Sequence, residues 1–268
     1  MSTAPQPKLW LFDFDTTLAL LDPVVDWPTL RAEVRRILER AHAPRTVTQQ
    51  VPPRALAMYE AYRAHLEHAP DPRGAKALAR ISKLIEKYEL AGVDRARPLE
   101  GTIDLLRAIS ERKLAAGIVT SNSSVTVKRW LRRHEVAPAI GFIVGRDSKL
   151  ALKPAPAMIK RALELAVAPV RDATFVGDSE DDLRAARRAR IRFIGIASNN
   201  AARDRLIAAG AQEIYSSPAA LAIHLNLAAI RPLGGAGKSH SVFRKRRGNS
   251  GIKKSGGPAD SSHVRLKR

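Results

Sequence analysis

The sequence contains no cysteine and no long hydrophobic stretch, and both absences narrow what the protein can be. Without cysteine there is no disulfide framework, no thiolate zinc site and no cysteine nucleophile, which leaves oxygen chemistry based on Asp, Glu, Ser and Thr. No segment stays apolar over the roughly 18 residues that a membrane span needs, and residues 1–8 lack the apolar core of a secretion signal. We therefore expect a cytoplasmic protein that does not contact membranes.

Acidic residues are scarce relative to basic ones, 26 against 46, and the net charge of +20 is unevenly distributed. Residues 231–268 hold eleven Lys or Arg and a single acid, Asp260, a net charge of +10. This tail is rich in Gly, Ser and Lys and poor in apolar residues, which predicts disorder. Its basic run, residues 244–247, could bind nucleic acid or another polyanion weakly. Base-reading motifs and interleaved aromatic residues are missing, so a solvated tail is the simpler interpretation.

Short apolar runs alternate with helical patterns over most of the chain. Runs typical of buried strands occur at residues 8–14, 115–119, 140–144, 173–176 and 193–196. Helical patterns lie between them, at residues 103–111, 125–134, 157–166 and 181–189. Strands that alternate with helices of about ten residues predict right-handed crossovers and a doubly wound parallel α/β sheet. Ligands of such sheets bind beyond the carboxyl ends of the strands.

The alternation is interrupted between residues 22 and 97, where the pattern is helical throughout. Three amphipathic helices are predicted there, separated by proline-bearing stretches, at residues 27–41, 53–68 and 75–90. We therefore predict an all-helical domain of residues 22–97, inserted into a core of residues 1–21 and 98–230.

Four short polar segments carry residues suited to chemistry, and three of them immediately follow predicted strands. The first holds Asp13 and Asp15. Alternate side chains of an extended chain point the same way, so both carboxylates could enter one pocket. Carboxylates this close repel each other unless a cation lies between them or one is protonated. A hard metal ion would relieve this repulsion, and in such a site one carboxylate can act as a nucleophile and the other as a general acid/base.

The other three segments supply groups for binding a phosphoryl oxygen and a further carboxylate. Thr120 and Ser121 follow a predicted strand and offer hydroxyl donors. Lys153 precedes a Pro-Ala-Pro sequence that opens a helix, and it provides a point charge for phosphate. Gly177 permits a sharp turn, so that Asp178 reaches the tip of its strand as a metal ligand.

In this order, the four segments resemble the motifs of the haloacid dehalogenase superfamily of phosphatases. Residues 13–17 (D-F-D-T-T) are similar to the D-x-D-x-T motif, Thr120 to the lone hydroxyl residue after a strand, Lys153 to the family lysine, and residues 177–182 to G-D-x-x-x-D. Thr16 departs from the pattern, because the family often has Gly there. The resemblance spans about residues 8–200, and the position of the helical insert is similar to the first cap class of the family, as in phosphoglycolate phosphatases and β-phosphoglucomutases.

The resemblance implies a Mg2+-dependent phosphatase that hydrolyses a small phosphorylated metabolite. Asp13 would attack phosphorus to form an aspartyl-phosphate, while Asp15 would protonate the leaving oxygen and then deprotonate water. Asp15 would bind the metal through its backbone carbonyl, and Asp182 would act through a metal-bound water or by orienting Lys153. The assigned phosphate ligands are Thr120, Ser121 and Lys153, and the assigned metal ligands are Asp13, Asp15, Asp178 and Asp182.

Two other functions stay open at this point. A phosphomutase of the β-phosphoglucomutase type would pass the phosphoryl group to a sugar rather than to water. A nucleic-acid-associated protein could use a non-catalytic fold of this kind as a scaffold. The sequence does not identify the substrate, because the predicted cap would select it and contains no motif that can be decoded.

Overall fold

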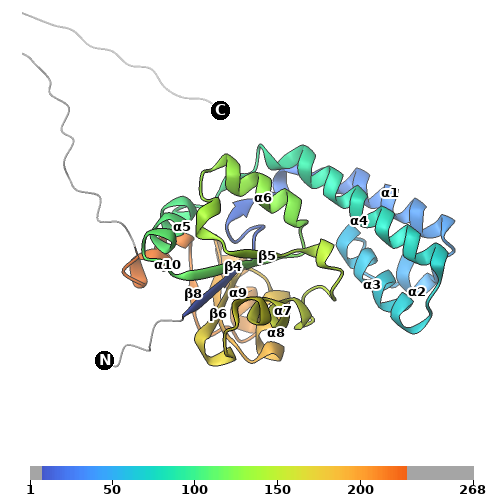
Figure 1. The fold of residues 1–268 in the computed structure, drawn as a ribbon. Helices are drawn as coiled ribbons and strands as arrows, with labels where there is room; N and C mark the ends of the chain where they lie inside the picture. Colours follow the sequence, from blue (N-terminus) through green and yellow to red (C-terminus); the bar gives the residue numbers. More distant parts are fainter. Residues whose placement is uncertain (1–7, 228–268) are drawn as a thin grey trace, which may run out of the picture. The chain divides into compact units, whose positions relative to one another are not determined.

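The computed structural model describes residues 8–227, and its centre is a six-stranded parallel sheet (Figure 1). The strand order is β5-β4-β1-β6-β7-β8. The strands are β1 (Leu9–Phe12), β4 (Ala115–Val119), β5 (Phe142–Val144), β6 (Ala173–Gly177), β7 (Arg192–Ile196) and β8 (Ile214–Tyr215). The order reverses direction at β1, so the carboxyl ends of β1, β4 and β6 lie side by side at the place where such sheets bind ligands.

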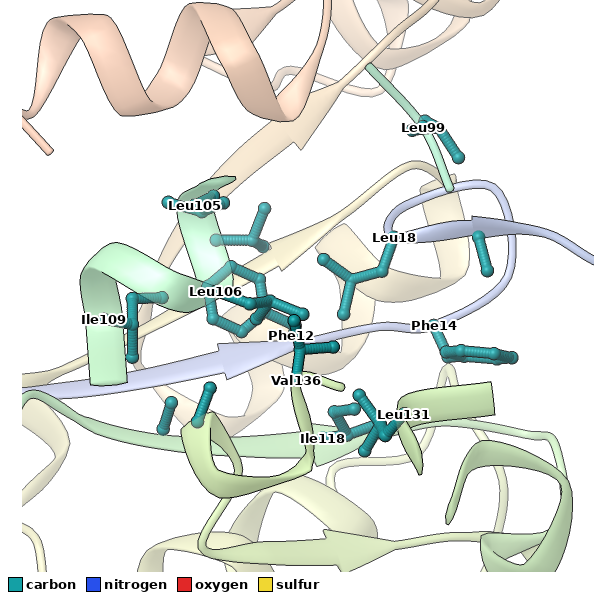
Figure 2. Close-up of a cluster of buried hydrophobic side chains, with 14 of the residues drawn as sticks. Phe12, Phe14, Leu18, Leu99, Leu105, Leu106, Ile109, Ile118, Leu131 and Val136 are labelled. Carbon is teal, nitrogen blue, oxygen red and sulfur yellow. The ribbon is translucent and has the colours of Figure 1, made fainter. Parts of the chain in front are cut away.

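Helices cover both faces of this sheet, and residues of β1 alternate between the two faces. Trp10 and Phe12 pack into one hydrophobic cluster, and Leu9 and Leu11 pack into another. Figure 2 shows the first cluster, in which Phe12 lies against a helix that runs from Thr102 to Glu111. The helices of this part of the chain are α5 (Thr102–Glu111), α6 (Ser124–Arg133), α7 (Ala157–Ala166), α8 (Glu180–Ala189), α9 (Asn200–Ala208) and α10 (Pro218–His224). The predicted doubly wound α/β fold is confirmed.

A second, antiparallel pair of short strands marks where the chain leaves this core and returns to it. These strands are β2 (Ala19–Leu20) and β3 (Arg97–Pro98). Between them lie α1 (Trp27–Arg40), α2 (Arg45–Thr48), α3 (Ala55–His68) and α4 (Pro72–Val93). Buried side chains of α1, α3 and α4 belong to the same hydrophobic cluster as Leu9 and Leu11. The division into a core and a separate insert of residues 22–97 stays a prediction.

Most differences between the predicted and observed elements occur at element ends and in short elements. The helix predicted to begin at residue 75 begins at Pro72, because the Asp71 side chain accepts the N–H groups of Arg73 and Gly74 and caps it. The strand predicted from residue 140 begins at Phe142. Elements of two to nine residues, which carry little periodicity, were not predicted: β2, β3, β8, α2, α9, α10 and the 3-10 helices Asp22–Val24, Ala137–Ala139, Arg146–Ser148 and Val170–Asp172.

Two predictions concern membranes and the tail. No helix within residues 8–227 combines the length and apolar character that crossing a membrane would require. The predictions of a disordered, polyanion-binding tail at residues 231–268 lie outside the described residues.

Candidate functional site

Three carboxylates meet where the strands β1 and β6 end. Asp13 follows β1, Asp178 follows β6, and Asp182 lies in the first turn of α8. Each offers an oxygen within 4.8 Å of the other two. The Asp13 N–H donates to the Val176 carbonyl at 2.8 Å, which extends the pairing of β1 with β6 by one residue. Strand pairing therefore brings residues 165 positions apart in the chain into one buried cluster.

Lys153 joins this cluster to the neighbouring strand β4. Its Nζ lies 2.6 Å from an oxygen of Asp13 and 2.6 Å from an oxygen of Asp182, and it donates to the Val119 carbonyl at 3.3 Å. Burial opposes the charge of this side chain, but the two carboxylates outweigh that effect and raise the pKa of Lys153. The carboxylate cluster therefore holds a fixed ammonium ion next to the end of β4.

Two threonines of the first motif hold Asp178. Thr16 Oγ1 donates to one carboxylate oxygen at 2.5 Å, and Thr17 Oγ1 donates to the other at 3.1 Å. Thr16 adopts a left-handed backbone conformation, with φ at 58°, at the position where the resembled family often has Gly. Burial raises the pKa of Asp178, and the negative charges of Asp182 and Asp13 raise it further.

The carboxylate of Asp15 is held apart from the three clustered carboxylates. Its Oδ1 accepts the N–H groups of Leu21 and Asp22, each at 2.9 Å. Burial nevertheless raises the pKa of Asp15 to about 7, and the neighbouring charge of Asp13 contributes. Asp15 therefore favours its protonated form more than an ordinary aspartate does. The metal-binding role predicted for this residue involves its backbone carbonyl and stays a prediction.

Both oxygens of Asp182 have partners within the protein. Oδ2 accepts the N–H groups of Asp178 and Ser179 at 3.2 and 3.0 Å and the Ser179 hydroxyl at 2.7 Å, while Oδ1 faces Lys153. A Cβ at residue 177 would lie 2.7 Å from the Asp182 side chain, so Gly177 is required for this approach. Of the two roles expected for Asp182, acting through a metal-bound water or orienting Lys153, its ion pair with Lys153 is consistent with the second, and both stay predictions.

The loop after β4 presents hydroxyl groups beside Lys153. The Thr120 hydroxyl donates to Asn122 Oδ1 at 3.0 Å and accepts the Asn122 N–H at 3.2 Å. Within residues 8–227, the hydroxyl and N–H of the half-buried Ser121 have no hydrogen-bond partner. Ser121 can therefore donate to a ligand as the structure stands, whereas Thr120 must exchange Asn122 for it.

Sequence reasoning missed Glu89 and Arg146, which form a fully buried ion pair next to this loop. The two residues are far apart in the chain and belong to no local pattern. The sequence offered one signal, which is that Glu89 is a charged residue on the apolar face of a predicted helix.

Comparison with known proteins places the chain among hydrolases. The family model described as haloacid dehalogenase-like hydrolase matches residues 10–196. A phosphoglycolate phosphatase of Rhodospirillum rubrum is 26% identical over 219 residues, which cover 80% of this chain and 89% of that protein. One from Pseudomonas putida is 28% identical over 204 residues, with 71% of this chain and 69% of that protein covered. The crystal structure of CbbY from Rhodobacter sphaeroides in complex with phosphate superposes with a TM-score of 0.57 at 21% identity, covering 81% of this chain and 96% of that one.

Proposed function

Because the chain belongs to the haloacid dehalogenase-like hydrolase family, we propose that it is a Mg2+-dependent phosphatase that hydrolyses a small organic phosphate monoester through Asp13. One observation carries the proposal. The Asp13 carboxylate lies at the carboxyl end of β1, 2.6 Å from the buried ammonium group of Lys153 and within 4.8 Å of two further carboxylates. This arrangement offers a nucleophile, a cation for the phosphoryl group and a place for a second cation.

The carboxylate cluster fits a divalent cation. Asp13, Asp178 and Asp182 carry three negative charges when ionised, and Lys153 balances one of them. Burial raises the pKa of Asp13 to about 6, against the opposing charge of Lys153, and the pKa of Asp178 is raised as well. The cluster thus carries more negative than positive charge when its carboxylates are ionised, and Mg2+ prefers oxygen ligands of this kind. Asp13, Asp178 and the backbone carbonyl of Asp15 would hold the ion, which would neutralise the repulsion between a carboxylate and a phosphate.

The remaining steps use groups of the protein itself. The Asp13 carboxylate attacks phosphorus and forms an aspartyl-phosphate, while the bond to the leaving oxygen breaks. Asp15 gives its proton to that oxygen, because its pKa of about 7 lies close to a neutral working pH. The resulting carboxylate then accepts a proton from the water that hydrolyses the aspartyl-phosphate, so both residues return to their initial states.

Phosphate binding falls to Lys153 and the loop after β4. Lys153 supplies a charged donor, which Asp182 holds in place. Ser121 offers its hydroxyl and N–H, which have no partner among residues 8–227, and Thr120 offers its hydroxyl once Asn122 releases it. Loss of one such donor typically costs about 10²- to 10³-fold in rate.

The test is a phosphate-release screen of the full chain with and without Mg2+. The panel comprises phosphoglycolate, sugar phosphates, nucleotides and 3′- or 5′-phosphorylated oligonucleotides, and the Asp13→Asn variant serves as the blank. Mg2+-dependent release from at least one small monoester is expected. Conversion of a sugar phosphate with little release would indicate a phosphomutase instead. No release above the blank from any compound would refute the proposal.

A further inference from the structure

A fully buried ion pair links the helix α4 to the segment after β5. Arg146 Nη1 lies 2.8 Å from Glu89 Oε1, Arg146 Nη2 lies 3.3 Å from Glu89 Oε2, and neither side chain is exposed to solvent. Buried ion pairs are weak evidence for stability by themselves, because desolvation opposes the attraction of the charges. The other contacts of the two residues therefore decide what the pair does.

Glu89 reaches from α4 to the start of α6. Its carboxylate accepts the Asn122 side-chain amide at 3.1 Å, the Ser123 N–H at 3.0 Å and the Thr126 hydroxyl at 3.1 Å. Together with the two bonds from Arg146, five donors surround these two oxygens. A negative charge at the beginning of a helix is also favoured by the helix dipole. The carboxylate is thus fully satisfied and fixes the residues that follow Ser121.

Arg146 holds the same loop from its other side. Its Nη1 donates to the Ser121 carbonyl at 2.7 Å, and its backbone N–H donates to the Asn122 carbonyl at 2.9 Å. Its Nη2 also donates to the Ser82 carbonyl of α4 at 3.4 Å. Every polar group of Asn122 and the carbonyl of Ser121 are therefore held, while the Ser121 hydroxyl and N–H are left for a ligand.

We propose that Glu89 and Arg146 are positioning residues that hold the phosphate-binding loop, residues 120–122, in the geometry that binds the phosphoryl group. The inference rests on the proposed function. Donors must lie within a few tenths of an ångström of the phosphoryl oxygens, and a misplacement of about 1 Å can cost about 100-fold in rate. Because Glu89 belongs to α4, the geometry of the loop depends on contacts with a helix that is distant in the sequence.

The experiment compares Glu89→Gln, Arg146→Lys and a matched control, Arg63→Gln. Arg63 is also largely buried on a helix between β2 and β3, but among the described residues its side chain bonds only Glu60 and Glu67 of its own helix. All measurements use the full chain at a temperature where every variant is folded by circular dichroism. The readouts are kcat, KM, binding of inorganic phosphate by calorimetry, and hydrogen exchange of the amides of residues 121–126.

Glu89→Gln is expected to lower kcat/KM and phosphate affinity by about 10- to 100-fold and to speed amide exchange in residues 121–126, while Arg63→Gln stays within about twofold of wild type. Arg146→Lys keeps the charge but loses the forked donor, so it should fall between the two. If Glu89→Gln and Arg63→Gln match in kcat, KM and phosphate affinity, the proposal is wrong. If wild type binds phosphate without hydrolysing any ester and Glu89→Gln weakens that binding, the positioning role stands and the proposed function fails.

Discussion

Asp15→Asn should abolish turnover and yet stabilise the metal-free protein at alkaline pH. The carboxyl of Asp15 has a pKa of about 7 in the folded protein, raised mainly by burial from a usual value of 3.8. A group whose pKa is raised by folding stabilises the protein fully below its unfolded pKa, and this contribution is lost as the pH rises through the folded pKa. Wild type without metal should therefore lose stability between about pH 4 and pH 7, whereas the Asp15→Asn variant, whose amide cannot ionise, should not lose this part.

The structure sets the size of the effect. A difference of about three pKa units corresponds to about 4 kcal/mol at about 1.4 kcal/mol per unit. Asp15 keeps some exposure to solvent, which reduces the penalty, so we expect about 2 kcal/mol. Both backbone N–H groups donate to the same oxygen, Oδ1, which the amide oxygen of Asn can replace. The substitution should therefore keep these two hydrogen bonds.

The assay is urea unfolding in a chelator at pH 4 and at pH 8. Asp15→Asn should raise the free energy of unfolding by about 2 kcal/mol at pH 8 and by much less at pH 4, close to the unfolded pKa. Asp104→Asn, which removes an exposed carboxylate in the first turn of α5, is the control and should change stability by less than about 0.5 kcal/mol at either pH. Equal stability of wild type and Asp15→Asn at pH 8, or an equal gain at both pH values, would refute the reasoning.

Three further predictions address the nucleophile, the metal and the turn before α8. Asp13→Asn should remove turnover while circular dichroism stays unchanged; activity above a small fraction of wild type would exclude Asp13 as the nucleophile. A chelator should silence phosphate release and added Mg2+ should restore it, so full activity in chelator would contradict the metal assignment. Gly177→Ala should lower kcat at least about tenfold and stability by about 1–3 kcal/mol, because its Cβ would push Asp182 away from Lys153. Gly141→Ala, whose Cβ would make only an ordinary 3.5 Å contact, should leave both quantities near wild type.

The sequence alone determined the sheet and the order of the chemical groups along it. The strand Ala115–Val119 and the helix Ala157–Ala166 have the predicted ends, because continuous apolar runs and 3.6-residue periodicity are local properties of the chain. The polar residues that follow these strands were also readable, since the carboxyl ends of parallel strands lie on one edge of the sheet. Their roles as nucleophile, acid and metal ligands stay predictions.

Tertiary structure decided the environment of each group. No local pattern indicates that Asp15 is held by the backbone of Leu21 and Asp22, or that Asp182 accepts hydrogen bonds through Oδ2 and pairs with Lys153 through Oδ1. The pKa values depend on burial and on charges that arrive from distant segments, as Lys153 does at Asp13. The link from Glu89 to Arg146 depends entirely on how α4 packs against the core, and packing of distant segments leaves no trace in the order of neighbouring residues.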